Sequence, residues 1–80
     1  MVYVTQYSHR YGHDVDVFST LEAAQAYKTA IAEEWWDWEF PDRPRPSLDE
    51  IGRIYFNLME DRVAYVGEWF SISEMVIRDD

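Results

Sequence analysis

Two segments at the start of the chain have patterns of hydrophobic and polar residues that are typical of β-strands. Residues 2–7 are rich in β-branched and aromatic side chains, and residues 14–18 alternate strictly between polar and apolar. A glycine in the segment between them can adopt the left-handed angles of a tight turn. The pattern predicts a β-hairpin over residues 2–18. Its two aspartates should face water, while Val15 and Val17 should face the core.

The period then changes to that of an α-helix. Ser19 and Glu22 have the spacing of a capping box, in which the serine hydroxyl accepts a hydrogen bond from the backbone N–H of the glutamate. Pro41 ends the pattern, because the residue before a proline avoids helical angles. We expect a helix over residues 20–40. Its predicted core-facing side consists of Leu21, Ala24, Tyr27, Lys28, Ile31, Ala32, Trp35 and Trp38.

Three prolines in residues 41–46 make that segment an extended connector. A second capping-box spacing begins at Ser47 and helical periodicity follows it, which predicts a helix over residues 48–63. The alternative is a hairpin that pairs residues 54–58 with residues 63–66.

Aromatic and β-branched residues return over residues 68–77, which indicates a last strand. The resulting order is ββααβ in a chain of 80 residues, the size of one small domain. We therefore predict a single α+β domain over residues 1–80, in which two helices pack on a small antiparallel sheet.

Charge constrains the partner. Sixteen Asp and Glu residues oppose seven Lys and Arg residues, and the net charge is −9. Such a surface repels nucleic acid and anionic membranes and attracts basic protein surfaces. Alternatively, the acidity serves only to keep an aromatic-rich protein in solution. The chain has no cysteine, no signal-peptide pattern and no apolar stretch long enough for a bilayer, so we expect a cytoplasmic protein.

The sequence offers little for catalysis. His9 and His13 lie near two aspartates, but no third histidine and no cysteine completes a usual zinc ligand set. Neighbouring carboxylates fall on solvated helix faces, where nothing separates their pKa values as acid–base catalysis requires. No glycine-rich loop can hold a phosphate. We expect no enzyme, no metal and no cofactor, so the function should be binding.

The segment at residues 35–40 combines three tryptophans and a phenylalanine with acids. These rings either close the core under the proline connector, or leave Trp36, Phe40 or Trp69 exposed as an interface anchor. An aromatic centre ringed by acids would suit a basic protein. The predicted partner-binding residues are Glu33, Glu34, Trp36, Asp37, Glu39 and Asp42.

Acids three or four residues apart on a helix lie about 5–6 Å from each other, a spacing that can imitate phosphates along a nucleic-acid strand. In size and charge the chain resembles the small acidic proteins that phages use against host defences, including anti-CRISPR and DNA-mimic proteins. It differs from a DNA mimic that is acidic on every side, because four arginines give it a less acidic sector. These are Arg43, Arg45, Arg53 and Arg62.

The resemblance implies a non-enzymatic inhibitor that blocks the basic nucleic-acid-binding surface of a host protein, without touching nucleic acid or membrane itself. One alternative is an immunity or antitoxin-like protein that caps a basic nuclease. Another is an accessory protein that forms a homodimer through Trp36, Trp69 or an exposed sheet edge.

Overall fold

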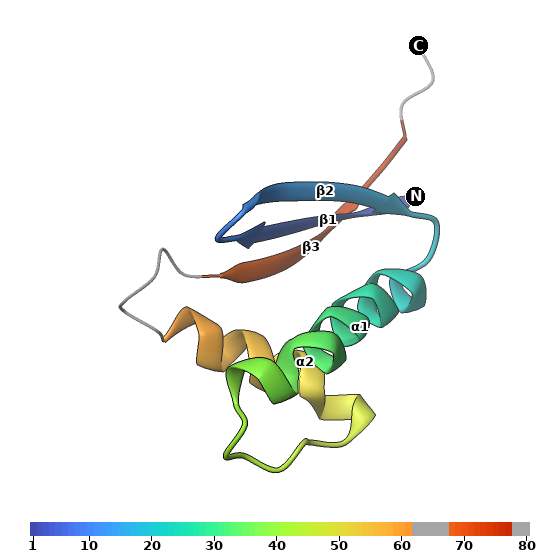
Figure 1. Cartoon of the computed structure of the whole chain (residues 1–80). Helices are drawn as coiled ribbons and strands as arrows, with labels where there is room; N and C mark the ends of the chain where they lie inside the picture. The colour runs from blue at the N-terminus through green and yellow to red at the C-terminus, as the bar shows by residue number, and fades with distance from the viewer. Residues whose placement is uncertain (62–67, 78–80) are drawn as a thin grey trace.

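The three strands form one antiparallel sheet in which the first strand is central. The computed structural model describes residues 1–61 and 68–77. Strands β1 (Val2–His9), β2 (Gly12–Phe18) and β3 (Trp69–Met75) lie in the order β2-β1-β3 (Figure 1). The predicted hairpin and the predicted last strand are both present, and strands β2 and β3 form the two edges of the sheet.

Both helices lie on the same face of this sheet, as Figure 1 shows. Helix α1 (Leu21–Glu39) packs against β1 and β2, and helix α2 (Leu48–Glu60) packs against α1 and β3. The element order is ββααβ, so the predicted α+β class is confirmed. Residues 54–58 are helical, so the hairpin alternative is wrong; its second segment, residues 63–66, lies outside the described residues.

The helix starts differ in detail from the predicted capping boxes. The cap of α1 is Thr20, whose Oγ1 accepts a hydrogen bond from the backbone N–H of Ala23 at 3.1 Å. Ser19 was the wrong cap by one residue. Only Ser19 has a glutamate three positions later, yet the path of the chain places Thr20 at the cap, so the capping-box spacing was not decisive. Ser47 does cap α2, but with its backbone carbonyl, 3.0 Å from the Glu50 nitrogen, and not with its side chain.

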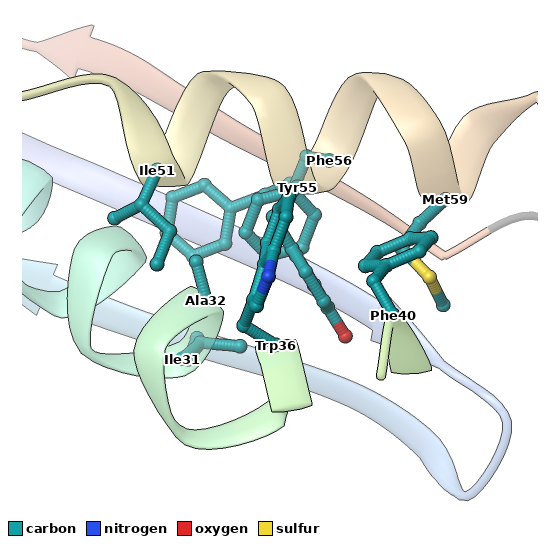
Figure 2. Close-up of a cluster of buried hydrophobic side chains, with 9 residues drawn as sticks. Ile31, Ala32, Trp36, Phe40, Ile51, Tyr55, Phe56 and Met59 are labelled. Carbon is teal, nitrogen blue, oxygen red and sulfur yellow. The ribbon is translucent and has the colours of Figure 1, made fainter. Parts of the chain in front are cut away.

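The core lies mainly between the two helices (Figure 2). Trp36 of α1 is 1% exposed, and its ring contacts Phe40 and Tyr55 at centroid distances of 5.0 and 6.5 Å. Ile51 and Met59 of α2 are 0% and 2% exposed. The aromatic residues thus supply the buried area that a chain of this length needs to fold without disulfides.

The sheet turns its valines away from this core. Val15 and Val17, predicted to be buried, are 57% and 62% exposed. In the register, Asp14 pairs with Tyr7, whose ring contacts Phe56 of α2 at 5.8 Å. The aspartates of β2 therefore lie on the helix-facing side, exposed at the sheet edge, and the valines lie on the opposite side. The strand period was right and the face was wrong. The rings of Tyr7 in β1 and Phe70 in β3 contact Phe56 of α2, and the strand register then places the valines of β2 on the other side.

Candidate functional site

A hollow of about 520 Å³ opens between the β1–β2 turn and the C-terminal half of α1. Its aromatic wall includes Tyr11 from the turn and Trp35 and Trp38 from α1. Tyr11 is 82% exposed, Trp38 76% and Trp35 36%. Large rings are normally buried when a core can take them, and exposed tryptophan and tyrosine are frequent anchors in interfaces.

One arginine and two carboxylates lie at the inner side of the hollow. The Arg10 Nη2 is 2.8 Å from Glu39 Oε1, and its Nε is 3.5 Å from Glu68 Oε1. The Glu39 and Glu68 side chains are 8% and 7% exposed, whereas Arg10 is 33% exposed. One cation therefore neutralises two nearly buried anions, one from α1 and one from the residue that precedes β3. Arg10 joins three parts of the fold that are far apart in sequence.

His9 has a structural role in the turn. Its Nδ1 accepts a hydrogen bond from the backbone N–H of Tyr11 at 3.2 Å, and its Nε2 lies 2.8 Å from Asp14 Oδ2. An accepting Nδ1 leaves the proton on Nε2, which donates to the carboxylate. With both nitrogens engaged, the ring holds Tyr11 at the rim of the hollow.

Two tyrosine hydroxyls also line the hollow. Burial raises the pKa of Tyr7 and of Tyr55 well above the ordinary value, and the negative charge of Glu68 raises both further. Asp14 and Glu34 add smaller increases to the pKa of Tyr7. Both phenols therefore stay protonated at neutral pH.

The hollow has an excess of negative charge. Its lining holds the carboxylates of Asp14, Glu39 and Glu68 against the single guanidinium of Arg10, so −3 and +1 leave −2 when His9 is neutral. Carboxylates and aromatic faces both attract cations. The combination is chemically suited to an arginine or lysine side chain of a partner. We call it the aromatic–acidic hollow, with Tyr11, Trp35, Trp38, Asp14, Glu39, Glu68 and Arg10 as its defining residues.

The structure changes the role predicted for the tryptophans. Trp36 cannot be an exposed anchor, since it is 1% exposed and its Nε1 donates a hydrogen bond to the Arg43 carbonyl oxygen at 3.3 Å. Phe40, 9% exposed, is also in the core. Trp38 was assigned to the core-facing side and is instead the most exposed of the ring residues on α1. The helical period was read correctly, but the buried stripe is rotated toward α2.

The five predicted acids do not form one uniform surface. Glu39 is paired with Arg10 inside the hollow, and the Asp37 carboxylate lies 2.8 Å from the Arg45 Nη2. Glu34 and Asp42 are exposed and Glu33 is half-buried. Within residues 1–61 and 68–77, no ion pair involves these last three acids. The protein's own arginines therefore neutralise part of the predicted surface.

Sequence reasoning missed the residues that close the hollow. Arg10, Tyr11 and Glu68 come from a loop and a strand start, where no periodicity marks their direction. A basic residue isolated in an acidic chain was the one available signal for Arg10. Glu39 and Glu68 follow 29 and 58 positions later, so only the folded chain shows that they pair with Arg10.

The chain has no match among protein-family models, curated proteins or solved structures. Within the described residues, no group of three or more histidines, aspartates and glutamates is placed to hold a metal ion. The two helices of that same part are too short or too polar to cross a membrane.

Proposed function

We propose that the protein is a non-enzymatic inhibitor that binds the basic nucleic-acid-binding surface of another protein. The observation that carries the proposal is the aromatic–acidic hollow, where Trp38 and Tyr11 are 76% and 82% exposed beside an excess of carboxylates. The partner would insert an arginine or lysine there, and the inhibitor would thereby occupy the surface that nucleic acid needs.

Charge supports a basic partner at two length scales. The net charge of −9 attracts a cationic surface over about one Debye length, roughly 8 Å at physiological salt. The hollow then acts at contact. Its Glu39 and Glu68 side chains are only 8% and 7% exposed, and a charge-assisted contact to a carboxylate is stronger away from water, while the exposed rings can stack on the same cation. The first effect sets the rate of encounter, and the second holds the complex.

The surface around the hollow supports a nucleic-acid-binding partner. Glu34 and Trp38 are four residues apart, on one flank of α1, so an acid and a ring project together. Glu33 and Asp37 have the same spacing on the outer side of the helix. Grooves that bind nucleic acid alternate cations that contact phosphates with surfaces that stack on bases, so they can accommodate such a pattern.

The test is a pull-down from extracts of the protein's native cells, at about 50 mM and about 500 mM salt. We expect capture of nucleic-acid-binding proteins that weakens strongly with salt. Adding the purified protein should then displace DNA or RNA from each captured protein. If a captured protein is a nuclease, a cleavage assay tests the immunity-like alternative. Under that alternative the protein suppresses the cleavage activity of the nuclease and not only its binding of nucleic acid.

Two variants connect capture to the hollow and to the adjoining flank of α1. Trp38→Ala and Glu34→Lys alter exposed side chains, so both should keep the fold and lower affinity at least about tenfold, as expected for an interface anchor. Glu22→Lys is the matched charge control, because 16 residues of helix separate it from Trp38, roughly 24 Å. Equal capture by all three variants, or captured proteins that keep their nucleic acid, would contradict the proposal.

A further inference from the structure

The sheet face opposite the helices has no charged side chain. It consists of the even-numbered residues of β1 and the odd-numbered residues of β2 and β3, as the strand register shows. None of these positions holds Asp, Glu, Lys or Arg, although 29% of the chain is charged. The charged residues of the strands, Asp14, Asp16 and Glu74, all lie on the helix side. Figure 1 shows both helices on that side.

Six of the eleven residues on this uncharged face are apolar, and several of them are exposed. Val15 and Val17 are 57% and 62% exposed on β2, and Met75 is 52% exposed on β3. The chain continues with Val76 and Ile77, which are 71% and 59% exposed. Single exposed apolar residues are common, but several grouped on one uncharged face are typical of an interface.

We propose that a second copy of this chain packs on the uncharged face, sheet against sheet about a two-fold axis. Two molecules of net charge −9 repel each other wherever their acids meet. When the two uncharged faces pack against each other, their apolar side chains come together. Both sets of acids and both hollows then stay on the outside of the dimer. A basic partner gains nothing at this face, and an anionic membrane is repelled by the rest of the molecule.

The size of the face sets the strength of this dimer. Strands of 7 or 8 residues are roughly 25 Å long, and three strands about 4.8 Å apart make a face about 15 Å wide. Such a patch covers about 375 Å² on each copy, so two copies bury roughly 750–1,000 Å² in total, in the range of weak and transient interfaces. We expect a dissociation constant in the micromolar range, about 1–100 μM.

Sedimentation equilibrium between about 1 μM and about 500 μM measures this association. The expected result is a monomer–dimer equilibrium that tightens at high salt, because salt screens the repulsion between the acids and does not weaken apolar contact. Capture of a basic partner has the opposite salt dependence. The dimer can therefore fail while the proposed inhibitor function stands, and the reverse also holds.

A pair of variants locates the interface. The double variant Val15→Lys, Val17→Lys changes the net charge from −9 to −7, which reduces the repulsion between copies. It should nevertheless abolish the dimer, because the ammonium groups would lose their hydration in the interface. Gln25→Lys with Ala26→Lys changes the charge equally at exposed positions of α1 and should dimerise at least as well as the parent. A monomer at all concentrations, or equal dimerisation by the two double variants, overturns the proposal.

Spin labelling separates packing of the faces from pairing of the sheet edges. The chain has no cysteine, so Ser73→Cys takes a single label, at a position paired with the central strand residue Val4. Packed sheets lie about 10 Å apart, so two labels should be within about 25 Å of each other, whereas a label on Ala26→Cys should be farther from its partner. A longer Ser73 distance than Ala26 distance contradicts the proposed face.

Discussion

Trp36 and Trp38 are two residues apart in α1 and have opposite environments, with exposures of 1% and 76%. Residues at positions i and i+2 of a helix point to different sides, so one ring enters the core and the other lines the hollow. Exposure and neighbouring acids, and not the residue type, therefore decide which tryptophan can contact a partner.

Replacing each ring by alanine should separate stability from binding. Trp36→Ala leaves a large void among Phe40, Tyr55 and Ile51, and we expect a loss of about 3–5 kcal/mol in the free energy of unfolding. Trp38→Ala should cost less than about 1 kcal/mol, because its ring already contacts water. Urea denaturation of both variants measures these differences. Equal losses would contradict the assignment of Trp36 to the core and Trp38 to the surface.

The buried phenols make stability depend on pH in the alkaline range. The pKa values of Tyr7 and Tyr55 are raised in the folded state, so both phenols keep their protons there when the unfolded chain ionises near pH 10. Their contribution is complete below pH 10 and is lost as pH rises through the folded pKa values. Tyrosine absorbance at about 295 nm should show these two rings ionising only when circular dichroism reports unfolding.

Tyr7→Phe is the control for this dependence. It removes one ionising group, so unfolding above pH 10 should become less steep with pH. Ionisation of all tyrosines near the ordinary value, with the fold intact, would show that neither hydroxyl is shielded from water.

At the scale of the elements, short-range signals predicted where helices occur but not how each one starts. The capping-box spacings, Pro41 and the 3.6-residue period placed both helices within a few residues of their observed bounds. The cap of α1 depends on which of two adjacent hydroxyl residues takes extended backbone angles, and Thr20 does, with φ −132° and ψ 152°. That choice follows from the path of the chain between β2 and α1.

Thr20→Ala should lower the free energy of unfolding by about 1 kcal/mol, because the Ala23 N–H loses its acceptor. Ser19→Ala, the adjacent control, should change it by less than about 0.5 kcal/mol. Chemical denaturation of the two variants compares them. A larger loss in the serine variant would restore the predicted capping box.

Across the whole molecule, acids are sorted by face and not spread evenly. The sheet is uncharged on one side, and the charged groups surround the helices and the hollow. Some acids are paired with Arg10, Arg45 and Arg53, yet the net charge stays at −9. Self-repulsion should therefore limit stability at low salt.

Raising sodium chloride from about 20 mM to about 500 mM should raise the melting temperature by a few degrees. The measurement is made near 1 μM protein, roughly at the lower limit of the range expected for dimer dissociation. The Gln25→Lys, Ala26→Lys variant, with net charge −7, should gain less from salt. A melting temperature that falls with salt would mean that the ion pairs of the hollow outweigh the repulsion.

The sequence alone determined the class, the order ββααβ and the acidity, because periodicity, proline and composition act over a few residues and do not depend on distant contacts. The tertiary structure decided which side of β2 is buried, which tryptophan is exposed, and that Arg10 lies between Glu39 and Glu68. Each of these depends on the burial that the whole chain achieves at once. Shifting a strand by one residue, or rotating a helix slightly, exchanges its buried and exposed side chains without altering any local sequence pattern.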